Sequence, residues 1–196
     1  MLSAVIPAAG LSTRMENKNK LLLPYHGKTV LEATLHNILA AGITDVVVVT
    51  GRDAELVRAA IQHLPVRMVH NPHFAAGLTG SIQKGVQEAT GDGYMICLAD
   101  MVLIMPDEYR LLAQQFARRQ AVDAKCICLP VYGGRRGNPV VFAAAWREAI
   151  MTHEQAEGCK AIVQGHAANV YEVEMTSDHV LQDMDYPEDY LRVAES

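Results

Sequence analysis

The feature that most constrains the fold is a series of short apolar runs separated by segments with helical periodicity. Residues 46–49 are four consecutive valines, and an unbroken β-branched run is typical of a strand covered on both faces. Runs at residues 2–6 and 94–99 are each predicted to form one strand, and residues 66–69 are predicted to form another. Since helical patterns separate these runs, the sequence predicts an α/β fold with a three-layer, mostly parallel, doubly wound sheet.

Helix signals support this alternation. Thr29 and Glu32 match a capping box for a helix that Gly42 closes. The other elements expected are, in order, a helix over 53–63, a helix from Ser81, a helix from Pro106 to about residue 120, strands over 124–130, 140–142 and 170–173, and a helix from Pro187. Because no linker or repeat interrupts the series, residues 1–196 are expected to form one domain.

Composition excludes several classes of protein. The net charge of −5 and the pI near 5.9 argue against a general nucleic-acid binder. No apolar run approaches the roughly 20 residues that span a membrane, and no basic region precedes Leu2 as in a signal peptide. The histidines show no zinc-site spacing, and the cysteines, which form no C-x-x-C pair, are expected to be reduced core thiols. These observations predict a cytoplasmic protein without nucleic-acid or membrane partners.

The loop after the first strand is built mainly from small residues. Pro7 is predicted to end that strand, because proline donates no ladder hydrogen bond. The residues that follow are Ala8, Ala9, Gly10, Leu11, Ser12 and Thr13. Small side chains let backbone N–H groups approach an anion closely, and Arg14 and Lys20 add positive charge. We predict a nucleoside triphosphate site here, the alternative being a glycine-containing turn that binds nothing.

A second candidate loop runs from Asn71 to Ser81 and contains Gly77. If Ser81 opens a helix, free N–H groups and the positive end of the helix dipole lie at this loop. A nucleotide base or ribose fits against such a turn. A helix N-cap without a ligand is the alternative.

Carboxylates at two places suggest a metal site. Asp100 follows the strand at residues 94–99, where ligands bind in α/β sheets. Mg²⁺ prefers one or two carboxylates together with substrate phosphates, so we predict Asp100 as a ligand, a turn cap being the alternative. Asp185 lies just outside the helix that starts at Pro187 and is predicted as the second ligand, with Asp183 as the alternative.

A third loop is flexible and cationic. It contains Gly133 and Gly134, followed by Arg135, Arg136, Gly137 and Asn138. Two arginines among glycines suit a second anionic substrate, and a solvated basic hairpin turn is the alternative.

The order of these motifs resembles a known family. The stretch A-A-G-L-S-T-R-M-x4-K-L-L-L-P and the later N-P…G…S, Asp-Met, G-x-x-G-x-P and D-x-D-x-P-x-D segments resemble the MobA-like nucleotidyltransferases, and within them the molybdenum cofactor cytidylyltransferases. The resemblance implies a Rossmann-like fold of the nucleotide-diphospho-sugar transferase type. The chain departs from the family pattern at Glu16, Gly80, Val102, Asn138 and Tyr186 and around Gly158.

The resemblance also implies a reaction and a set of residues. The nucleotide-binding set would be Ala8, Ala9, Gly10, Leu11, Ser12, Thr13, Arg14, Lys20, Asn71, Gly77, Ser81 and Asp100, with Arg14, Lys20 and Asp100 catalytic. The acceptor-binding set would be Arg135, Arg136, Gly137 and Asn138, and the metal set Asp100 and Asp185. Family members with Ala-Ala-Gly in the first loop use CTP, so CTP is expected here.

The expected reaction is Mg²⁺-dependent transfer of a cytidylyl group from CTP to a phosphorylated acceptor, with release of pyrophosphate. The resemblance indicates molybdenum-molybdopterin as the acceptor and a molybdoenzyme as a further partner. The alternatives are a transferase that uses GTP or another phosphorylated acceptor, and a non-catalytic chaperone that binds the nucleotide or the cofactor. The missing G-x-G-x-x-G argues against a dinucleotide-binding oxidoreductase.

Overall fold

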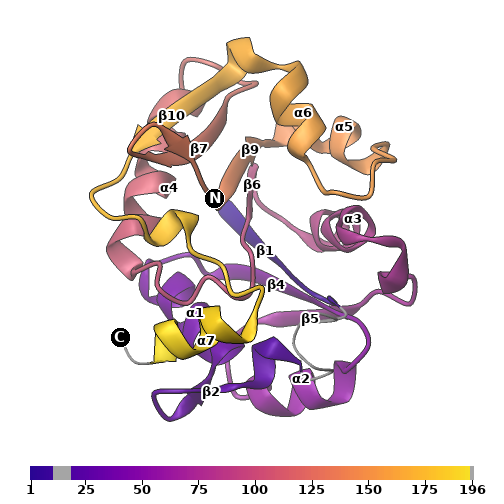
Figure 1. Ribbon diagram of the computed structural model, residues 1–196. Coiled ribbons are helices and arrows are strands. Elements are labelled where there is room, and N and C mark those ends of the chain that lie inside the picture. The colour runs from indigo at the N-terminus through magenta and orange to yellow at the C-terminus, as the bar shows by residue number, and fades with distance from the viewer. Residues whose placement is uncertain (11–18, 195–196) are drawn as a thin grey trace.

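The computed structural model describes residues 1–10 and 19–194, and within them the chain forms one large mixed sheet (Figure 1). The strand order is β10-β7-β9-β6-β1-β4-β5, and the short strand β8 pairs with the carboxyl end of β7. The bounds are β1 Leu2–Ala8, β4 Asp45–Thr50, β5 Arg67–His70, β6 Gly93–Ile96, β7 Ile127–Tyr132, β8 Arg135–Arg136, β9 Val140–Ala143 and β10 Val170–Glu174. A separate hairpin joins β2 (Pro24–Tyr25) and β3 (Lys28–Thr29).

The sheet is mostly parallel and doubly wound. Strands β5, β4, β1 and β6 run parallel to one another, and β7 runs parallel to β10. Strand β9 runs antiparallel between β6 and β7. The chain passes from β1 to β4 and β5 on one side and then returns to β6 on the other side of β1. The predicted fold class is therefore confirmed, and the winding reverses between β1 and β6.

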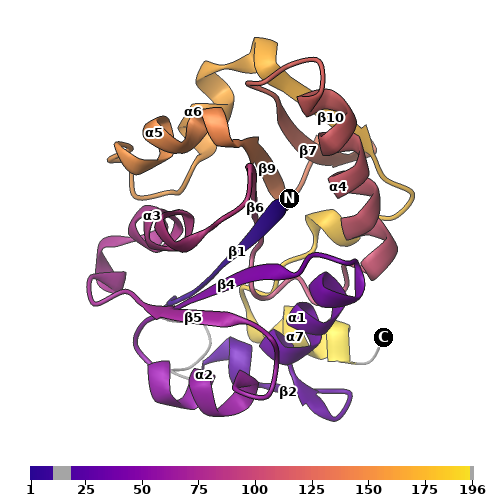
Figure 2. The same ribbon diagram turned by 180° about the vertical axis from the view of Figure 1, so that it is seen from behind.

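Helices cover both faces of the sheet (Figures 1 and 2). The bounds are α1 Val30–Ala40, α2 Ala54–Ile61, α3 Leu78–Glu88, α4 Pro106–Gln120, α5 Arg147–Met151, α6 Lys160–Gly165 and α7 Pro187–Ala194. Helices α1 and α4 pack together on one face, and α3 and α5 on the other. Helix α3 lies so close to the sheet that a Cβ atom added at Gly85 would overlap the side chain of Val5. In the described part of the chain, no helix is both long enough and apolar enough to cross a lipid bilayer.

The helix signals in the sequence fix α1 and α4. The Thr29 side chain accepts a hydrogen bond from the Glu32 N–H, and the Glu32 side chain accepts one from the Thr29 N–H, which completes the predicted capping box. Gly42 follows α1 with a φ of 89°, a left-handed conformation that glycine adopts without strain. Helix α4 spans Pro106–Gln120, the residues predicted from the sequence.

Strand β1 corrects the expectation that Pro7 ends the first strand. It continues to Ala8, and Pro7 pairs with Val49 of β4. The Val5 carbonyl accepts a hydrogen bond from Cys97 N–H, and every second residue of a strand directs its polar groups to the same neighbour. The missing N–H of Pro7 therefore faces the β6 side, where β6 has already ended at Ile96. Proline is tolerated because no ladder bond is lost there.

Other boundaries also differ from the expectation. Helix α3 begins at Leu78 rather than Ser81, with Gly77 at its N-cap and Ser81 buried in its first turn. Strand β6 ends at Ile96 instead of residue 99, and β7 lies at Ile127–Tyr132 rather than 124–130. These errors arise because apolar runs continue into buried loops, so hydrophobicity alone does not mark where the ladder stops.

The core contains most residues of the apolar runs, whereas β5, at the edge of the sheet, is only partly buried. The four valines at residues 46–49 are at most 1% exposed. Trp146 is also buried, and its indole N–H donates to the Lys125 carbonyl. All four cysteines are buried and free, as expected. Burial raises the pKa of the Cys159 thiol to about 12, so this thiol is unreactive at neutral pH.

Candidate functional site

The first residues of the predicted nucleotide loop, Ala8, Ala9 and Gly10, lie at the carboxyl end of β1, beside the point where the winding reverses. Ala8 and Ala9 are buried at the end of this strand, and Gly10 is exposed. Ligands bind at this position in doubly wound sheets. Leu11, Ser12, Thr13 and Arg14 lie outside the described residues, so their predicted contacts with a triphosphate remain predictions.

Lys20 follows this loop and is held by a short 3-10 turn, Lys20–Leu22. Asn19 caps the turn, because its side chain accepts a hydrogen bond from Leu21 N–H at 3.1 Å. The amide of Asn19 in turn donates to Asp53 Oδ2 at 2.9 Å. Two hydrogen bonds therefore fix the residue before Lys20, and they direct the lysine side chain toward the end of the sheet.

Lys20 joins the two carboxylates that the sequence predicted as metal ligands. Its Nζ lies 2.5 Å from Asp100 Oδ2 and 3.0 Å from Asp185 Oδ1. Asp100 follows β6 and is 8% exposed, whereas Asp185 precedes α7 and is 39% exposed. Residues from three distant segments thus meet at one point, which we call the Lys20–Asp100–Asp185 cluster.

The start of α7 places Asp185. Asp189 Oδ2 accepts hydrogen bonds from the Asp185 N–H at 3.1 Å and the Tyr186 N–H at 2.9 Å. This carboxylate satisfies N–H groups that precede the helix, as a capping side chain does. Pro187 is the first helical residue. The cap therefore fixes the backbone from which the Asp185 side chain reaches Lys20.

The electrostatics of the cluster reflect its crowded charges. Burial lowers the pKa of Lys20, but attraction to Asp100 and hydrogen bonds to Asp100 and Asp185 outweigh it, so the pKa is raised overall. The pKa of nearby Asp183 is also raised, first by partial burial and then by repulsion from Asp100 and Asp185. Lys20 stays protonated at neutral pH, and the three carboxylates repel one another.

This arrangement fits a divalent cation. Asp100 and Asp185 already converge on one positive charge, the ammonium group of Lys20. Carboxylate oxygens are the ligands that Mg²⁺ and Mn²⁺ prefer, and both ions retain coordination sites for water or phosphate oxygens. Asp183, whose proton affinity is increased by the same negative field, lies close enough to strengthen that field.

The second predicted loop is held by its own side chains. Asn71 is 4% exposed, and its amide donates to Ser81 Oγ at 3.0 Å while its Oδ1 accepts from His73 N–H. Asn71 therefore ties the end of β5 to the first turn of α3. Gly77 at the N-cap has a φ of 122°, a conformation that other residues rarely adopt.

A segment with no recognisable motif also contributes to this region. The Leu78 N–H donates to the Ala156 carbonyl at 3.0 Å. Thr79 Oγ1 donates to the Gln155 carbonyl and accepts from Gly158 N–H at 3.0 Å. Residues 155–158 therefore cover the start of α3. No sequence signal identified this contact, because Thr79 and Gly158 are separated by 79 positions in the chain.

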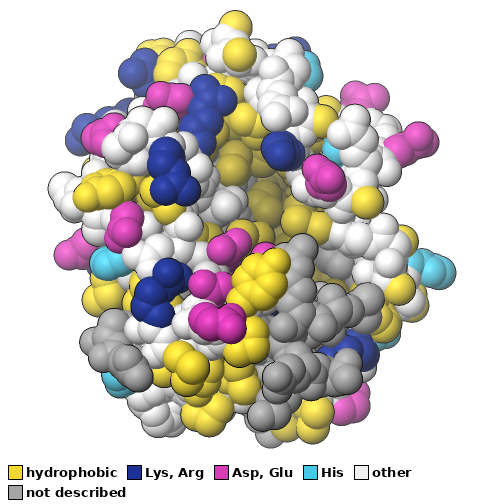
Figure 3. Space-filling model, in the orientation of Figure 1, with side chains coloured by type: hydrophobic (Ala, Val, Ile, Leu, Met, Phe, Trp, Pro, Cys, Tyr) yellow, Lys and Arg dark blue, Asp and Glu magenta, His cyan; other side chains and the backbone are white. Residues whose placement is uncertain are grey.

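A cavity of about 410 Å³ opens between the start of α3, strands β7 and β9, and α6. Figure 3 shows a hollow with an apolar floor on this face, with Lys and Arg side chains above it and Asp and Glu side chains below it. Its lining includes Arg136, Gly137 and Asn138 of the predicted acceptor loop and also Lys160. Lys160 is exposed, and no motif in the sequence around it marks it as a site residue.

Arg135, which precedes Arg136 in the predicted acceptor loop, lines a different cavity. Arg135 lines a cavity of about 620 Å³ that also contains Asp183 and Arg192. Arg136, in contrast, has its Nε 2.7 Å from Glu172 Oε1. Because adjacent residues of a strand point to opposite faces, β8 separates the two arginines that the sequence grouped in one loop.

Comparisons with known proteins agree with this geometry. A family model described as a MobA-like NTP transferase domain matches residues 4–170. The chain belongs to this family. It is therefore an enzyme of the nucleotidyltransferase type, as the motif order predicted.

Two curated relatives illustrate the range of the family. The chain is 26% identical to the molybdenum cofactor cytidylyltransferase of Escherichia coli, over 99% of this chain and 96% of the relative. It is 31% identical to the nicotine blue oxidoreductase of Paenarthrobacter nicotinovorans, over 76% of this chain and 74% of the relative. A relative named as an oxidoreductase thus exists beside one named as a transferase.

Solved structures share the whole fold. A nucleotidyl transferase from Methanothermobacter thermautotroptrophicus matches with a TM-score of 0.88 and 28% identity, covering 100% of this chain and 96% of that one. The Rv0371c protein of Mycobacterium tuberculosis, solved as a complex with manganese, matches with a TM-score of 0.81 and 25% identity, covering 100% and 98%. A divalent ion is therefore bound by one relative of this fold.

Proposed function

We propose that this enzyme transfers the cytidylyl group of CTP to molybdenum-molybdopterin in a Mg²⁺-dependent reaction that releases pyrophosphate. The observation that carries the proposal is that Asp100 and Asp185 converge on the ammonium group of Lys20, just after the first loop. The likeness to a molybdenum cofactor cytidylyltransferase over nearly the full length supports the acceptor. The Ala8-Ala9-Gly10 sequence supports CTP as the donor.

In the proposed reaction, a phosphate oxygen of the acceptor attacks the α-phosphorus of CTP. A new P–O bond forms, the bond from the α-phosphorus to the bridging oxygen breaks, and pyrophosphate leaves with its electron pair. An acceptor phosphate is already ionised at neutral pH, so no general base is needed. Catalysis then depends on holding the reactants in line and neutralising their charge.

Named residues would supply those two effects. Asp100 and Asp185 would hold Mg²⁺, and the bound ion would neutralise phosphate charge and polarise the α-phosphate. Lys20 would leave the two carboxylates when the ion binds and would contact the departing pyrophosphate, together with Arg14. Gly10 and the residues that follow it would bind the triphosphate through backbone N–H groups. Asn71, Gly77 and Ser81 would shape the surface for the base and ribose.

The cavity beside α3 is the proposed acceptor site. Its apolar floor and its rim, with Arg136 and Lys160, suit a flat ring system that carries phosphate. Gly137 and Asn138 line the same cavity. We include Arg135 in the acceptor loop as the sequence predicted, although it faces the adjacent cavity that contains Asp183.

Pyrophosphate release tests the proposal. The purified enzyme is incubated with molybdenum-molybdopterin, Mg²⁺ and either CTP or GTP, and pyrophosphate is measured with time. The proposal expects release with CTP that requires both the acceptor and Mg²⁺. Faster release with GTP would retain the reaction and overturn the donor, whereas no release with either nucleotide would overturn the reaction.

The relative named as an oxidoreductase supplies the rival function. Oxidation of NADH or NADPH by an electron acceptor, followed by absorbance, distinguishes the two. Nicotinamide turnover without pyrophosphate release would favour the rival.

A further inference from the structure

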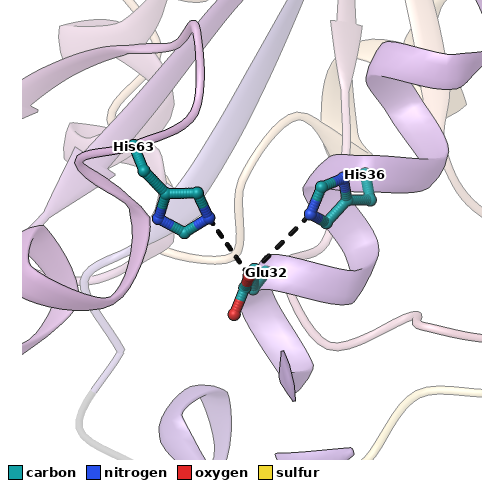
Figure 4. Close-up of side chains that lie close together, drawn as sticks. All are labelled: Glu32, His36 and His63. Atoms are coloured by element: carbon teal, nitrogen blue, oxygen red, sulfur yellow. Dashed lines mark hydrogen bonds and ion pairs between the residues drawn. The ribbon is translucent and has the colours of Figure 1, made fainter. Parts of the chain in front are cut away.

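A second group of metal-ligating side chains lies apart from the Lys20–Asp100–Asp185 cluster. It consists of Glu32 and His36 on α1 and of His63, which follows α2. One ligand atom of each residue lies within 4.8 Å of the other two. Figure 4 shows both imidazole rings directed toward the Glu32 carboxylate from opposite sides. We call these residues the Glu32–His36–His63 cluster.

The distances approach those of a coordinated ion. His63 Nε2 lies 3.2 Å from Glu32 Oε1, and His36 Nε2 lies 3.8 Å from the same oxygen. Ligand atoms about 2.0–2.1 Å from a tetrahedral Zn²⁺ are roughly 3.3 Å apart. The distance from His63 to Glu32 already matches this edge, and the distance from His36 to Glu32 exceeds it by about 0.5 Å. The ligand nitrogens of the two histidines lie within 4.8 Å of each other, so the rings also have to approach each other around an ion. At 3.8 Å, the contact of His36 is too long for a direct hydrogen bond.

The Glu32 carboxylate is held in place, while the two imidazoles retain freedom to adjust. Glu32 is 18% exposed, and its Oε2 accepts the capping-box hydrogen bond from Thr29 N–H. This bond orients Oε1 toward the histidines, as outer hydrogen bonds commonly orient metal ligands. His36 and His63 are 43% and 54% exposed, so their rings can rotate onto an ion without disturbing the core.

The donor set selects a class of metal. Two imidazoles and one carboxylate suit Zn²⁺ and its neighbours among the transition metals, whereas Mg²⁺ prefers oxygen ligands alone. We propose that Glu32, His36 and His63 bind one divalent transition-metal ion of the Zn²⁺ or Co²⁺ type, with water completing its coordination. This site differs from the Lys20–Asp100–Asp185 cluster, where the candidate ligands are carboxylate oxygens without imidazole nitrogens.

A bound ion would connect parts of the fold that are far apart in sequence. Glu32 and His63 are separated by 31 positions, and the ion would fasten α1 to the segment between α2 and β5. Metal binding of this kind stabilises the folded state, because the three ligands do not converge in the unfolded chain. Sequence spacing missed the site for the same reason.

The test is a Co²⁺ titration of the purified enzyme in excess Mg²⁺, which saturates sites made of oxygen ligands. Tetrahedral Co²⁺ absorbs strongly in the visible range, and Zn²⁺ should displace it. We expect one equivalent of bound Co²⁺ in the wild type. Glu32→Gln, His36→Gln and His63→Gln should each weaken binding by about tenfold or more, since changes in outer-shell partners alone cost 10–100-fold.

The variants are chosen to keep the fold. Glutamine at position 32 retains the capping box, because its carbonyl oxygen accepts the same hydrogen bond. His70→Gln is the matched control, since His70 is an exposed histidine outside the cluster. It should bind Co²⁺ as the wild type does. Zn²⁺ should also raise the Tm of the wild type and of His70→Gln but not that of His63→Gln.

Two outcomes would overturn the site. One is the absence of stoichiometric Co²⁺ binding in the wild type. The other is unchanged binding in all three cluster variants.

Discussion

Two clusters of charged side chains, at opposite ends of the sheet, use aspartate in different ways. At the amino end, Asp45 at the start of β4 is 9% exposed. It accepts hydrogen bonds from Ser3, Arg67 and Thr90. At the carboxyl end, Asp100 and Asp185 share Lys20, and Asp183 lies within their field.

The pKa values separate the two clusters. Burial raises the pKa of Asp45, but hydrogen bonds, of which the one from Ser3 has the largest effect, lower it by more. The resulting pKa is about 2. The pKa of Asp183 is raised by partial burial and by its acidic neighbours. The amino-end carboxylate is thus stabilised by hydrogen bonds of the fold, whereas the carboxyl-end acids repel one another and share the one positive charge of Lys20. The comparison teaches that the acids at the carboxyl end, unlike Asp45, have mutual repulsion that an added cation would relieve.

The largest expected effect comes from breaking the carboxyl-end cluster. Asp100→Asn keeps the shape of the side chain but removes one proposed metal ligand. We expect kcat for pyrophosphate release to fall about 10³-fold, a loss typical of removing one charge-stabilising group. Far-UV circular dichroism should be unchanged. Activity within threefold of the wild type would remove Asp100 from the mechanism.

Asp45→Asn tests the other half of the comparison. Since its pKa is about 2 against an ordinary value of 3.8, the substitution should lower the free energy of unfolding at pH 7 by about 2 kcal/mol. Urea denaturation measures this loss. The kcat at a temperature where both proteins are folded should not change, and a fall comparable to that of Asp100→Asn would contradict the division of roles.

The pH dependence of Asp45 has a defined sign. A depressed pKa stabilises the folded state above the unfolded pKa, and this contribution disappears as the pH falls through the folded pKa. The stability difference between wild type and Asp45→Asn should therefore be full above about pH 5 and should close between about pH 4 and pH 2. Urea unfolding at pH 7, 4 and 2.5 follows it. A constant difference across this range would show that charge is not the cause.

The smallest effect is expected for Asp183→Asn. A raised pKa means that the ionised Asp183 side chain destabilises the folded state at neutral pH. Removing its charge should raise the free energy of unfolding by at most roughly 0.5 kcal/mol, because the side chain is only partly buried and solvent screens its charge. The gain should vanish near pH 3, where Asp183 is protonated in both states. Destabilisation at pH 7 would argue against mutual repulsion.

Much of the fold follows from local signals in the sequence. The capping box at Thr29 and the proline at position 106 fixed the starts of α1 and α4, since both signals act within one turn of helix. The predictions made from Pro7 and Ser81, the end of β1 and the start of α3, were wrong. The role of each residue depends on a partner outside its own segment. The missing N–H of Pro7 faces the side on which β6 has ended, and Ser81 bonds to Asn71 instead of capping α3.

The site was predictable in its acids and less so in its surroundings. Asp100 could be placed because it follows the strand at residues 94–99, where ligands bind in α/β sheets. Asp185 was paired with it because it lies just outside the last helix, in a D-x-D-x-P-x-D segment that resembles the family. The position of Lys20 between them depends on a tertiary approach, as does the cover that residues 155–158 provide for α3. The cavity position of Lys160 had no motif to signal it.

Thermal stabilisation by CTP, with and without Mg²⁺, in the wild type and in Asp185→Asn, tests the central claim most directly. A ligand that binds the folded state raises its stability by about 2.7 kcal/mol at a hundredfold excess over Kd. We predict a rise in Tm that needs CTP and Mg²⁺ together and is lost in Asp185→Asn. An equal rise without Mg²⁺, or in the variant, would contradict a metal-dependent nucleotide site at the Lys20–Asp100–Asp185 cluster.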